Sequence, residues 1–152
     1  MEDKQKFELT LEITKNPETE DAVYLWSKLR EHGLSKLNDP DLEERFSFHI
    51  TLKNNDLIVG GVIGMVYYRG MHVQLLWVDE GHRFQGLGSK LLVEAEKLAR
   101  EHRCTVMYLD TFGFQAPDFY PKHGFEVFGV LEKFPKHYNR TFFKKELATD
   151  VG

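Results

Sequence analysis

Apolar and polar residues alternate over residues 7–14, FELTLEIT, around β-branched side chains, and this pattern predicts a half-buried strand. Apolar residues then recur at helical spacing over residues 22–29. Asn16 and Pro17 supply a helix start signal, and Gly33 supplies a stop signal. We therefore expect the chain to begin with one strand and one helix.

Three apolar segments in the middle of the chain predict consecutive strands at residues 46–53, 57–68 and 71–78. The first turn between them is Asn-Asn-Asp, and the second contains Arg69 and Gly70. Because strands joined by such short turns run in opposite directions, we expect an antiparallel meander.

A loop with three glycines follows, and an amphipathic helix comes directly after it. One face of that helix carries Leu87, Leu91, Leu92, Ala95, Leu98 and Ala99. Residues 104–112 predict the next strand. A strand–helix–strand unit of this size makes its two strands parallel through a right-handed crossover. The glycine loop is therefore expected at the carboxyl end of strand 71–78.

The last part of the chain predicts a helix at residues 116–124 and two strands near 124–131 and 140–147. The complete pattern indicates an α/β fold (an α+β mixed sheet) with about seven strands.

Composition narrows the class of protein. The 152 residues, 41% of them hydrophobic, suffice for one core, so we expect a single domain over residues 1–152. A net charge of -4 argues against nucleic-acid binding, which needs a clustered positive field. No stretch has the pattern of a signal peptide or a membrane span, so we expect a cytoplasmic protein without membrane contact. The single cysteine, Cys104, is expected to pack in the core.

The glycine loop, with Gly81, Gly86 and Gly88, has the character of a phosphate site. Unpaired N–H groups at a helix N-terminus bind phosphate, and glycines let the phosphate approach closely. The dinucleotide fingerprint fails because Leu91 occupies its third glycine position. The nucleotide P-loop fails because residues 88–90 are Gly-Ser-Lys rather than Gly-Lys-Ser/Thr.

The segment from Arg83 to Gly88, Arg-Phe-Gln-Gly-Leu-Gly, resembles the R/Q-x-x-G-x-G/A pyrophosphate motif of the GNAT superfamily of acyl-CoA-dependent N-acetyltransferases. As in that family, the strand's terminal aliphatic residue, Val78, precedes the motif by five residues, and an aliphatic-rich helix follows from Leu87. The order of elements along roughly the whole chain also resembles the family's fold. The resemblance implies a mostly antiparallel mixed sheet with two parallel strands splayed apart, flanked by about four helices.

The resemblance implies acetyl-CoA as co-substrate and no metal. Backbone N–H groups around the loop are then expected to hold the pyrophosphate, and the splayed strands to admit the pantetheine arm. The Val78 N–H is expected to face the thioester carbonyl, where a donor stabilises an oxyanion. Lys122 is expected either to hold a CoA phosphate or to remain solvated. The expected cofactor-binding residues are Trp77, Val78, Arg83, Phe84, Gln85, Gly86, Leu87, Gly88, Ser89 and Lys122.

Residues 119–125, FYPKHGF, resemble the family's Tyr-x-x-x-Gly-Phe segment. The resemblance implies that Tyr120 is the general acid that protonates the leaving thiolate. The alternative is a tyrosine that only packs against Phe119 and Phe125. The chain departs from the family pattern at Gly113, where many members carry an asparagine that contacts the cofactor.

His72 is the candidate general base. Its parity along the strand predicts that it shares one face with Gln74, Leu76 and Val78. Some members of the family place a histidine or glutamate here to accept a proton through water, and a partly solvated strand histidine is the alternative.

The acceptor site is the least specified part of the sequence. Asp110 is expected either to attract a cationic amine or to cap a turn. Tyr24 and Trp26 are expected either to line an acceptor pocket or to belong to the core.

The function that we expect is transfer of an acetyl group from acetyl-CoA to a primary amine of a small molecule, by direct attack in a ternary complex. A protein lysine or N-terminal acetyltransferase and a non-catalytic acyl-CoA-binding sensor are the alternatives. Many members of the family form dimers through their C-terminal strands, so the resemblance implies either a homodimer by edge pairing through residues 140–147 or a monomer whose edge Lys144 and Lys145 protect.

Overall fold

The computed structural model describes residues 8–148, and the chain falls into two compact units, residues 1–38 and 39–152. The described part of the first unit, residues 8–38, contains one helix, α1 (Glu20–Leu37). The side chain of Thr19 caps it by accepting a hydrogen bond from the Ala22 N–H at 3.3 Å. The helix therefore begins later than the Asn16–Pro17 signal predicted.

The predicted end of α1 at Gly33 is wrong, because the helix continues to Leu37 and closes on Asn38 in the left-handed conformation, with φ of 48°. A glycine inside a helix costs about 1 kcal/mol, which a helix of this length tolerates. The predicted strand 7–14 is also wrong for residues 8–14, which form no strand, and residue 7 lies outside the described residues. Alternation alone does not make a strand, since a strand needs a neighbour that pairs with its backbone.

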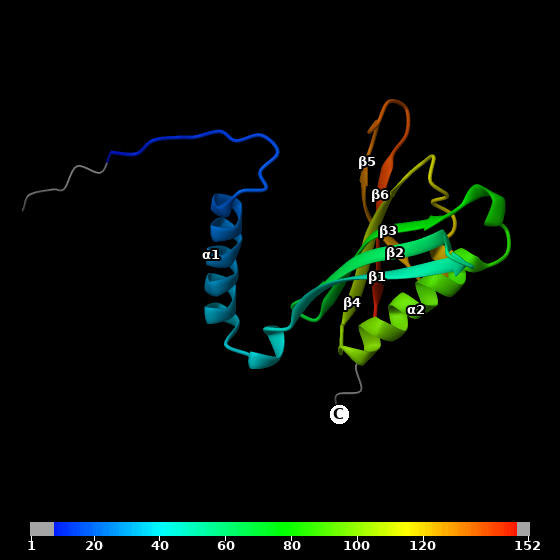
Figure 1. The fold of residues 1–152 in the computed structure, drawn as a ribbon, viewed down its shortest axis with the longest axis horizontal. Coiled ribbons are helices and arrows are strands. Elements are labelled where there is room, and N and C mark those ends of the chain that lie inside the picture. Colours follow the sequence, from blue (N-terminus) through cyan, green and yellow to red (C-terminus); the bar gives the residue numbers. More distant parts are fainter. Residues whose placement is uncertain (1–7, 149–152) are drawn as a thin grey trace, which may run out of the picture. The chain divides into compact units, whose positions relative to one another are not determined.

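The second unit is built on one mixed sheet, shown in Figure 1. Its strands are β1 (Arg45–Asn54), β2 (Leu57–Tyr67), β3 (Gly70–Val78), β4 (Val106–Phe112), β5 (Glu126–Leu131) and β6 (Arg140–Glu146). They lie in the order β1-β2-β3-β4-β6-β5. Among the described strands only β3 and β4 pair in parallel, which confirms the predicted antiparallel meander and the parallel pairing of the strands on either side of α2.

Between residues 8 and 148 the sheet has six strands rather than about seven, and the α-helices are α1 and α2 (Leu87–Glu101) rather than about four. Three short 3-10 helices add to them: η1 (Pro40–Leu42), η2 (Glu80–His82) and η3 (Pro121–His123). The predicted helix over 116–124 is reduced to turns and η3, since Pro121 lacks an N–H and Gly124 has a φ of 83°. No helix in the described part of the chain has the length and apolar character of a membrane span.

One face of the sheet carries the core, because α2 lies along it (Figure 1). The buried face of α2 consists of Leu91, Leu92, Ala95 and Ala99. These side chains pack against buried residues of β2, β3, β4 and β6, among them Val62, Met71, Met107 and Phe143. Cys104 is 1% exposed, as predicted, and burial raises the pKa of its thiol to about 11. The thiol is therefore an unreactive core group at neutral pH.

The parallel strands separate soon after they begin. β3 and β4 pair at only three positions, from Gly70 opposite Val106 to His72 opposite Tyr108. Beyond these positions β3 continues to Val78 with no pairing to β4. The splay implied by the family resemblance is therefore present, and the opening begins immediately after His72.

A bulge in β3 changes which residues share a face. The register between β2 and β3 shifts between Ile63 and Gly64, which leaves Gln74 without a partner on β2. An extra residue inverts the alternation of side chains beyond it. Val73 therefore faces α2 before the bulge, and Leu76 does so after it.

The predicted common face of His72, Gln74, Leu76 and Val78 is therefore wrong. His72 belongs to the face opposite α2, while Val78 packs toward α2. A Cβ built on Gly60, the partner of Val78, lies 3.4 Å from Leu91 of α2 and 3.5 Å from the Val78 side chain, which identifies the α2 face.

Candidate active site

The end of β3 and the glycine loop are tied together by polar contacts. The Asp79 carboxylate accepts from the Gly81 N–H at 3.2 Å and lies 3.1 Å from Nδ1 of His82. Arg83 turns back toward the strand, and its Nε donates to the Val78 carbonyl at 3.2 Å. The loop is therefore anchored to the strand end, and the Arg83 side chain is one of the anchors.

The loop ends at Gly86, the N-cap residue of α2, which has a φ of 73° and supplies no side-chain cap. A Cβ at Gly86 meets no atom within 4 Å, so the space in front of this residue is open. The first N–H groups of α2, on Leu87, Gly88 and Ser89, have no partner within the helix. An open helix N-terminus with positive dipole and free donors suits an anion such as phosphate.

Phe84 and Gln85 are exposed in the turn before Gly86. Phe84 has a φ of 64°, which is uncommon for a residue with a Cβ. The loop therefore makes a turn with a left-handed residue directly before the α2 N-terminus.

The segment that contains Tyr120 packs against the same helix N-terminus. The Ser89 hydroxyl lies 2.9 Å from Nε2 of His123, and a Cβ on Gly88 lies 3.5 Å from the Phe119 ring. Lys122 is exposed in η3 beside His123. The two motifs recognised in the sequence therefore meet in space, and His123 joins them.

Tyr120 is a buried phenol, 8% exposed. Its ring packs against Phe119, Phe125 and Phe143, with centroid distances of 5.2, 5.9 and 5.6 Å. Its hydroxyl forms no hydrogen bond with any described residue. Burial, with a smaller effect of the Asp110 charge, raises the pKa of Tyr120 to about 12. The hydroxyl is therefore protonated at neutral pH and can donate a proton or a hydrogen bond.

The backbone of Val78 points into the opening between β3 and β4. The Asp79 N–H donates to the Val59 carbonyl at 2.8 Å, so Asp79 and Val59 form a hydrogen-bonded pair between β3 and β2. The adjacent pair, Val78 opposite Gly60, is then non-hydrogen-bonded, so the N–H and C=O of Val78 point away from β2. Trp77 precedes it and is 43% exposed.

His72 lies on the other face of the sheet, at the start of the opening. Its ring stacks on Tyr108, with centroids 4.6 Å apart and 3° between the planes. The Tyr108 hydroxyl is hydrogen-bonded to the Tyr67 hydroxyl. Burial lowers the pKa of His72, the Asp110 carboxylate raises it, and the Arg140 guanidinium lowers it. The pKa of His72 lies below its ordinary value, so the imidazole is neutral at pH 7 and can accept a proton.

Asp110 is a strand residue that pairs with a cation, and it does not cap a turn. Its Oδ2 accepts from Nε of Arg140 at 2.7 Å across β4 and β6. Sequence reasoning missed Arg140, because no local pattern around it indicates which residue of another strand it meets.

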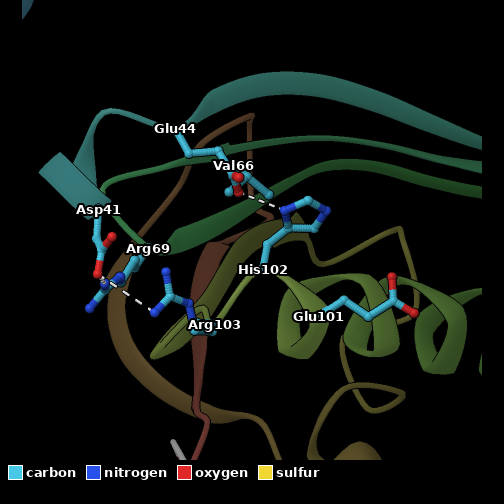
Figure 2. A pocket seen from close by; sticks show the side chains of 7 residues that line it. All are labelled: Asp41, Glu44, Val66, Arg69, Glu101, His102 and Arg103. Carbon is cyan, nitrogen blue, oxygen red and sulfur yellow. Dashed lines mark hydrogen bonds and ion pairs between the residues drawn. The ribbon is translucent and has the colours of Figure 1, made fainter.

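A concavity lies at the opposite end of α2. This cavity, of about 320 Å³, lies between η1, the β2–β3 turn and the C-terminal end of α2 (Figure 2). The Asp41 carboxylate lies 2.6 Å from Arg69 and 3.6 Å from Arg103. On the other side, Glu44 lies 2.6 Å from His102. Most of its charged groups thus pair with one another, which makes the cavity a structural junction.

Comparisons with known proteins agree with this geometry. Residues 8–125 match the acetyltransferase (GNAT) family. The chain is similar to a blasticidin-S acetyltransferase of Streptomyces morookaense, with 40% identity over 91 residues, 59% of this chain and 67% of that protein. It is also similar to the crystal structure of an acetyltransferase from Bacillus cereus, with a TM-score of 0.79, 38% identity and coverage of 90% of this chain and 98% of that one.

A more distant structure adds a likeness of fold alone. It is an aminoglycoside 6'-N-acetyltransferase complexed with coenzyme A, with a TM-score of 0.61, 17% identity and coverage of 79% of this chain and 81% of that one.

Proposed function

Because the chain belongs to the GNAT family and is an acetyl-CoA-dependent acetyltransferase, we propose that it acetylates a primary amine of a small molecule by direct attack in a ternary complex. The observation that carries the proposal is the opening between β3 and β4. The α2 N-terminus and the Tyr120 segment lie beside this opening, and His72 lies at its start. We also propose that residues 1–152 act as one N-acetyltransferase domain, since the family match crosses the boundary between the two units.

The assignment of the acetyl-CoA site rests on the open space in front of Gly86 and on the unpaired N–H groups at the α2 N-terminus. The N–H groups from Phe84 to Ser89 hold the pyrophosphate, and the open position in front of Gly86 admits it. The N–H and C=O of Val78 pair with the pantetheine arm, because β4 no longer occupies that side of β3, and Trp77, whose own N–H and C=O point toward β2, adjoins the arm. We assign to Lys122, which is exposed in η3, a contact with a CoA phosphate. Bound there, acetyl-CoA supplies the thioester that the amine attacks.

Two residues on opposite faces of the sheet carry out the proton transfers: His72 accepts a proton and Tyr120 donates one. As the nitrogen–carbon bond forms and the carbon–sulfur bond breaks, the amine proton passes to the neutral imidazole of His72, through water. The Val78 N–H stabilises the negative charge on the carbonyl oxygen. Tyr120 donates its proton to the leaving thiolate, a role that its raised pKa favours.

The similarity to a blasticidin-S acetyltransferase supports a small-molecule acceptor over a protein lysine or N-terminus. Acyl-CoA sensing without catalysis is less consistent with a buried, protonated Tyr120 beside the α2 N-terminus. The predicted edge at residues 140–147 is wrong, because β6 lies between β4 and β5 and pairs with both. Either a monomer or a homodimer through the edge strand β5 is compatible with this assignment.

The test is thiol release from acetyl-CoA with a panel of amines, each compared with a reaction that lacks the amine. The panel contains blasticidin S, aminoglycosides, amino acids, polyamines, and peptides with a free lysine or N-terminus. Amine-dependent release with small molecules supports the proposal. Thiol release with peptides alone would instead favour a protein acetyltransferase. If none of the amines causes thiol release, only acyl-CoA binding would remain.

A further inference from the structure

The Arg140 guanidinium, on the face of the sheet opposite α2, has N–H donors without a partner among the described residues. Its Nε donates to Asp110 at 2.7 Å, and no described residue accepts from its two terminal nitrogens. Its side chain remains 32% exposed. Four of the five guanidinium N–H donors are therefore available to another molecule.

Aromatic rings and Asp110 hold this guanidinium in place. Its Cζ lies 5.3 Å from the ring centroid of Phe112, 5.9 Å from that of Phe134 and 5.2 Å from that of Phe142. Contacts of this kind fix the orientation of a guanidinium and reduce the entropy lost when it binds a ligand. The planar fork is thus oriented before any ligand arrives.

This guanidinium lies beside the opening that, under the proposed function, admits the reacting groups. On the face opposite α2, Asp110 is the first residue of β4 after Tyr108, the last residue that pairs with β3. Arg140 is on β6, the neighbour of β4 at a spacing of about 4.8 Å. His72, at the start of the opening, senses the charges of both Asp110 and Arg140.

We propose that the acceptor carries a carboxylate besides its primary amine, and that Arg140 binds this carboxylate while the amine enters the opening between β3 and β4. The inference rests on the proposed function. The guanidinium fork matches a carboxylate through two parallel hydrogen bonds. Asp110 is a positioning residue, since it fixes Nε and leaves the terminal nitrogens to the ligand.

The other cation on this face of β6 does not offer such a site. Nζ of Lys144 already lies 3.3 Å from Glu146 and 3.8 Å from Glu126. Lys144 is on the same strand as Arg140 and on the same face, so it provides a matched control.

The experiment compares amines that differ only in the carboxylate. The pairs are glycine and glycinamide, β-alanine and β-alaninamide, and γ-aminobutyrate and its amide. The kcat/KM of each is measured by thiol release and expressed per neutral amine, because an amide lowers the pKa of a nearby amine. In the wild-type protein we expect at least one carboxylate to exceed its amide by about 10- to 100-fold, the range of a charge-assisted hydrogen bond.

Two variants of Arg140 test the assignment. Arg140→Gln brings the ratio of carboxylate to amide close to one, mainly by raising the KM for the carboxylate. Arg140→Lys keeps the charge but loses the fork, so it gives an intermediate ratio. Lys144→Gln keeps the wild-type ratio. The KM for acetyl-CoA and the melting temperature of each variant identify any variant that has lost its fold.

The outcomes separate this inference from the proposed function. Equal kcat/KM values for carboxylates and amides, with thiol release from both, would overturn the inference and leave the proposed function intact. An unchanged ratio in both Arg140 variants would also overturn it. If no amine in either panel supports thiol release, the proposed function fails and the inference fails with it.

Discussion

The imidazole of His72 lies flat on the phenol ring of Tyr108, with ring centroids 4.6 Å apart. These two residues are the last pair at which β3 and β4 are joined. A cross-strand aromatic pair of this kind stabilises a sheet by about 0.2–1 kcal/mol. The stack therefore holds the strands together at the last paired position and places the candidate base at the start of the opening.

Replacement of His72 by glutamine tests its role as the base. Burial lowers the pKa of His72, so the neutral form that accepts a proton is already dominant at pH 7. Wild-type activity is expected to rise with pH through an ionisation below about 6.5, and His72→Gln is expected to lose this rise. The measurement is the pH profile of kcat/KM for both proteins.

Ionisation of the amine itself produces a second rise at higher pH, so both proteins are assayed with the same acceptor. A His72→Gln protein with the wild-type rate and the low-pH rise would show that His72 is only a structural partner of Tyr108.

Replacement of Tyr120 by phenylalanine removes a hydroxyl that has no hydrogen-bond partner in the described chain. We expect kcat to fall by roughly 10- to 1000-fold, with little change in the affinity for acetyl-CoA or in the melting temperature. Because the pKa of Tyr120 is raised to about 12, its deprotonation causes no loss of wild-type activity between pH 7 and about 10. Undiminished turnover at saturating substrate would mean that the thiolate leaves without this acid.

Much of the second unit could be predicted because its signals are local. Turn residues between apolar segments define the β1–β2–β3 meander, and helical periodicity after the glycine loop defines α2. The bulge at Gln74 could not be predicted, since it depends on how β3 aligns with β2. That one residue places His72 and Val78 on opposite faces. The strand expected at residues 8–14 was mispredicted for a similar reason, because an alternating pattern does not specify a neighbouring strand to pair with.

The candidate site divides in the same way. The loop before α2 and the segment around Tyr120 are continuous in sequence, and each was recognised from its own residues. The pair of Asp110 and Arg140 joins residues 30 positions apart, and only the β4–β6 register brings them together. Side-chain type indicates what a residue can bind, while the sheet register determines which partner it meets.

Substitution of Gly86 tests whether the loop holds the cofactor. The φ of 73° gives this glycine a conformational reason to lack a Cβ, and a phosphate bound in the open space in front of it would add a steric one. Gly86→Val is expected to weaken acetyl-CoA binding by about 10-fold or more, because its branched side chain occupies the phosphate position. Calorimetric titration measures the affinity.

Gly86→Asn separates the two reasons, since asparagine tolerates positive φ and still adds a side chain. If the space is what matters, both variants bind acetyl-CoA weakly. Wild-type affinity in both would contradict the assignment of the pyrophosphate to this loop.

Gly64 lies at the β2–β3 bulge, where the sheet has no room for a side chain. A Cβ there lies 2.6 Å from the Phe48 ring and 2.8 Å from the His72 carbonyl oxygen, so the backbone of β3 must shift to admit it. Gly64→Ala is expected to lower the free energy of unfolding by about 1–3 kcal/mol, measured by urea denaturation. Gly129→Ala is the control, because a Cβ there makes an ordinary 3.9 Å contact with Phe142. The control is expected to be neutral or more stable by about 0.4–1 kcal/mol, since alanine restricts the unfolded chain. Equal stabilities of the two variants would mean that β3 adapts at its bulge without cost, and the position of His72 would then not be fixed by packing.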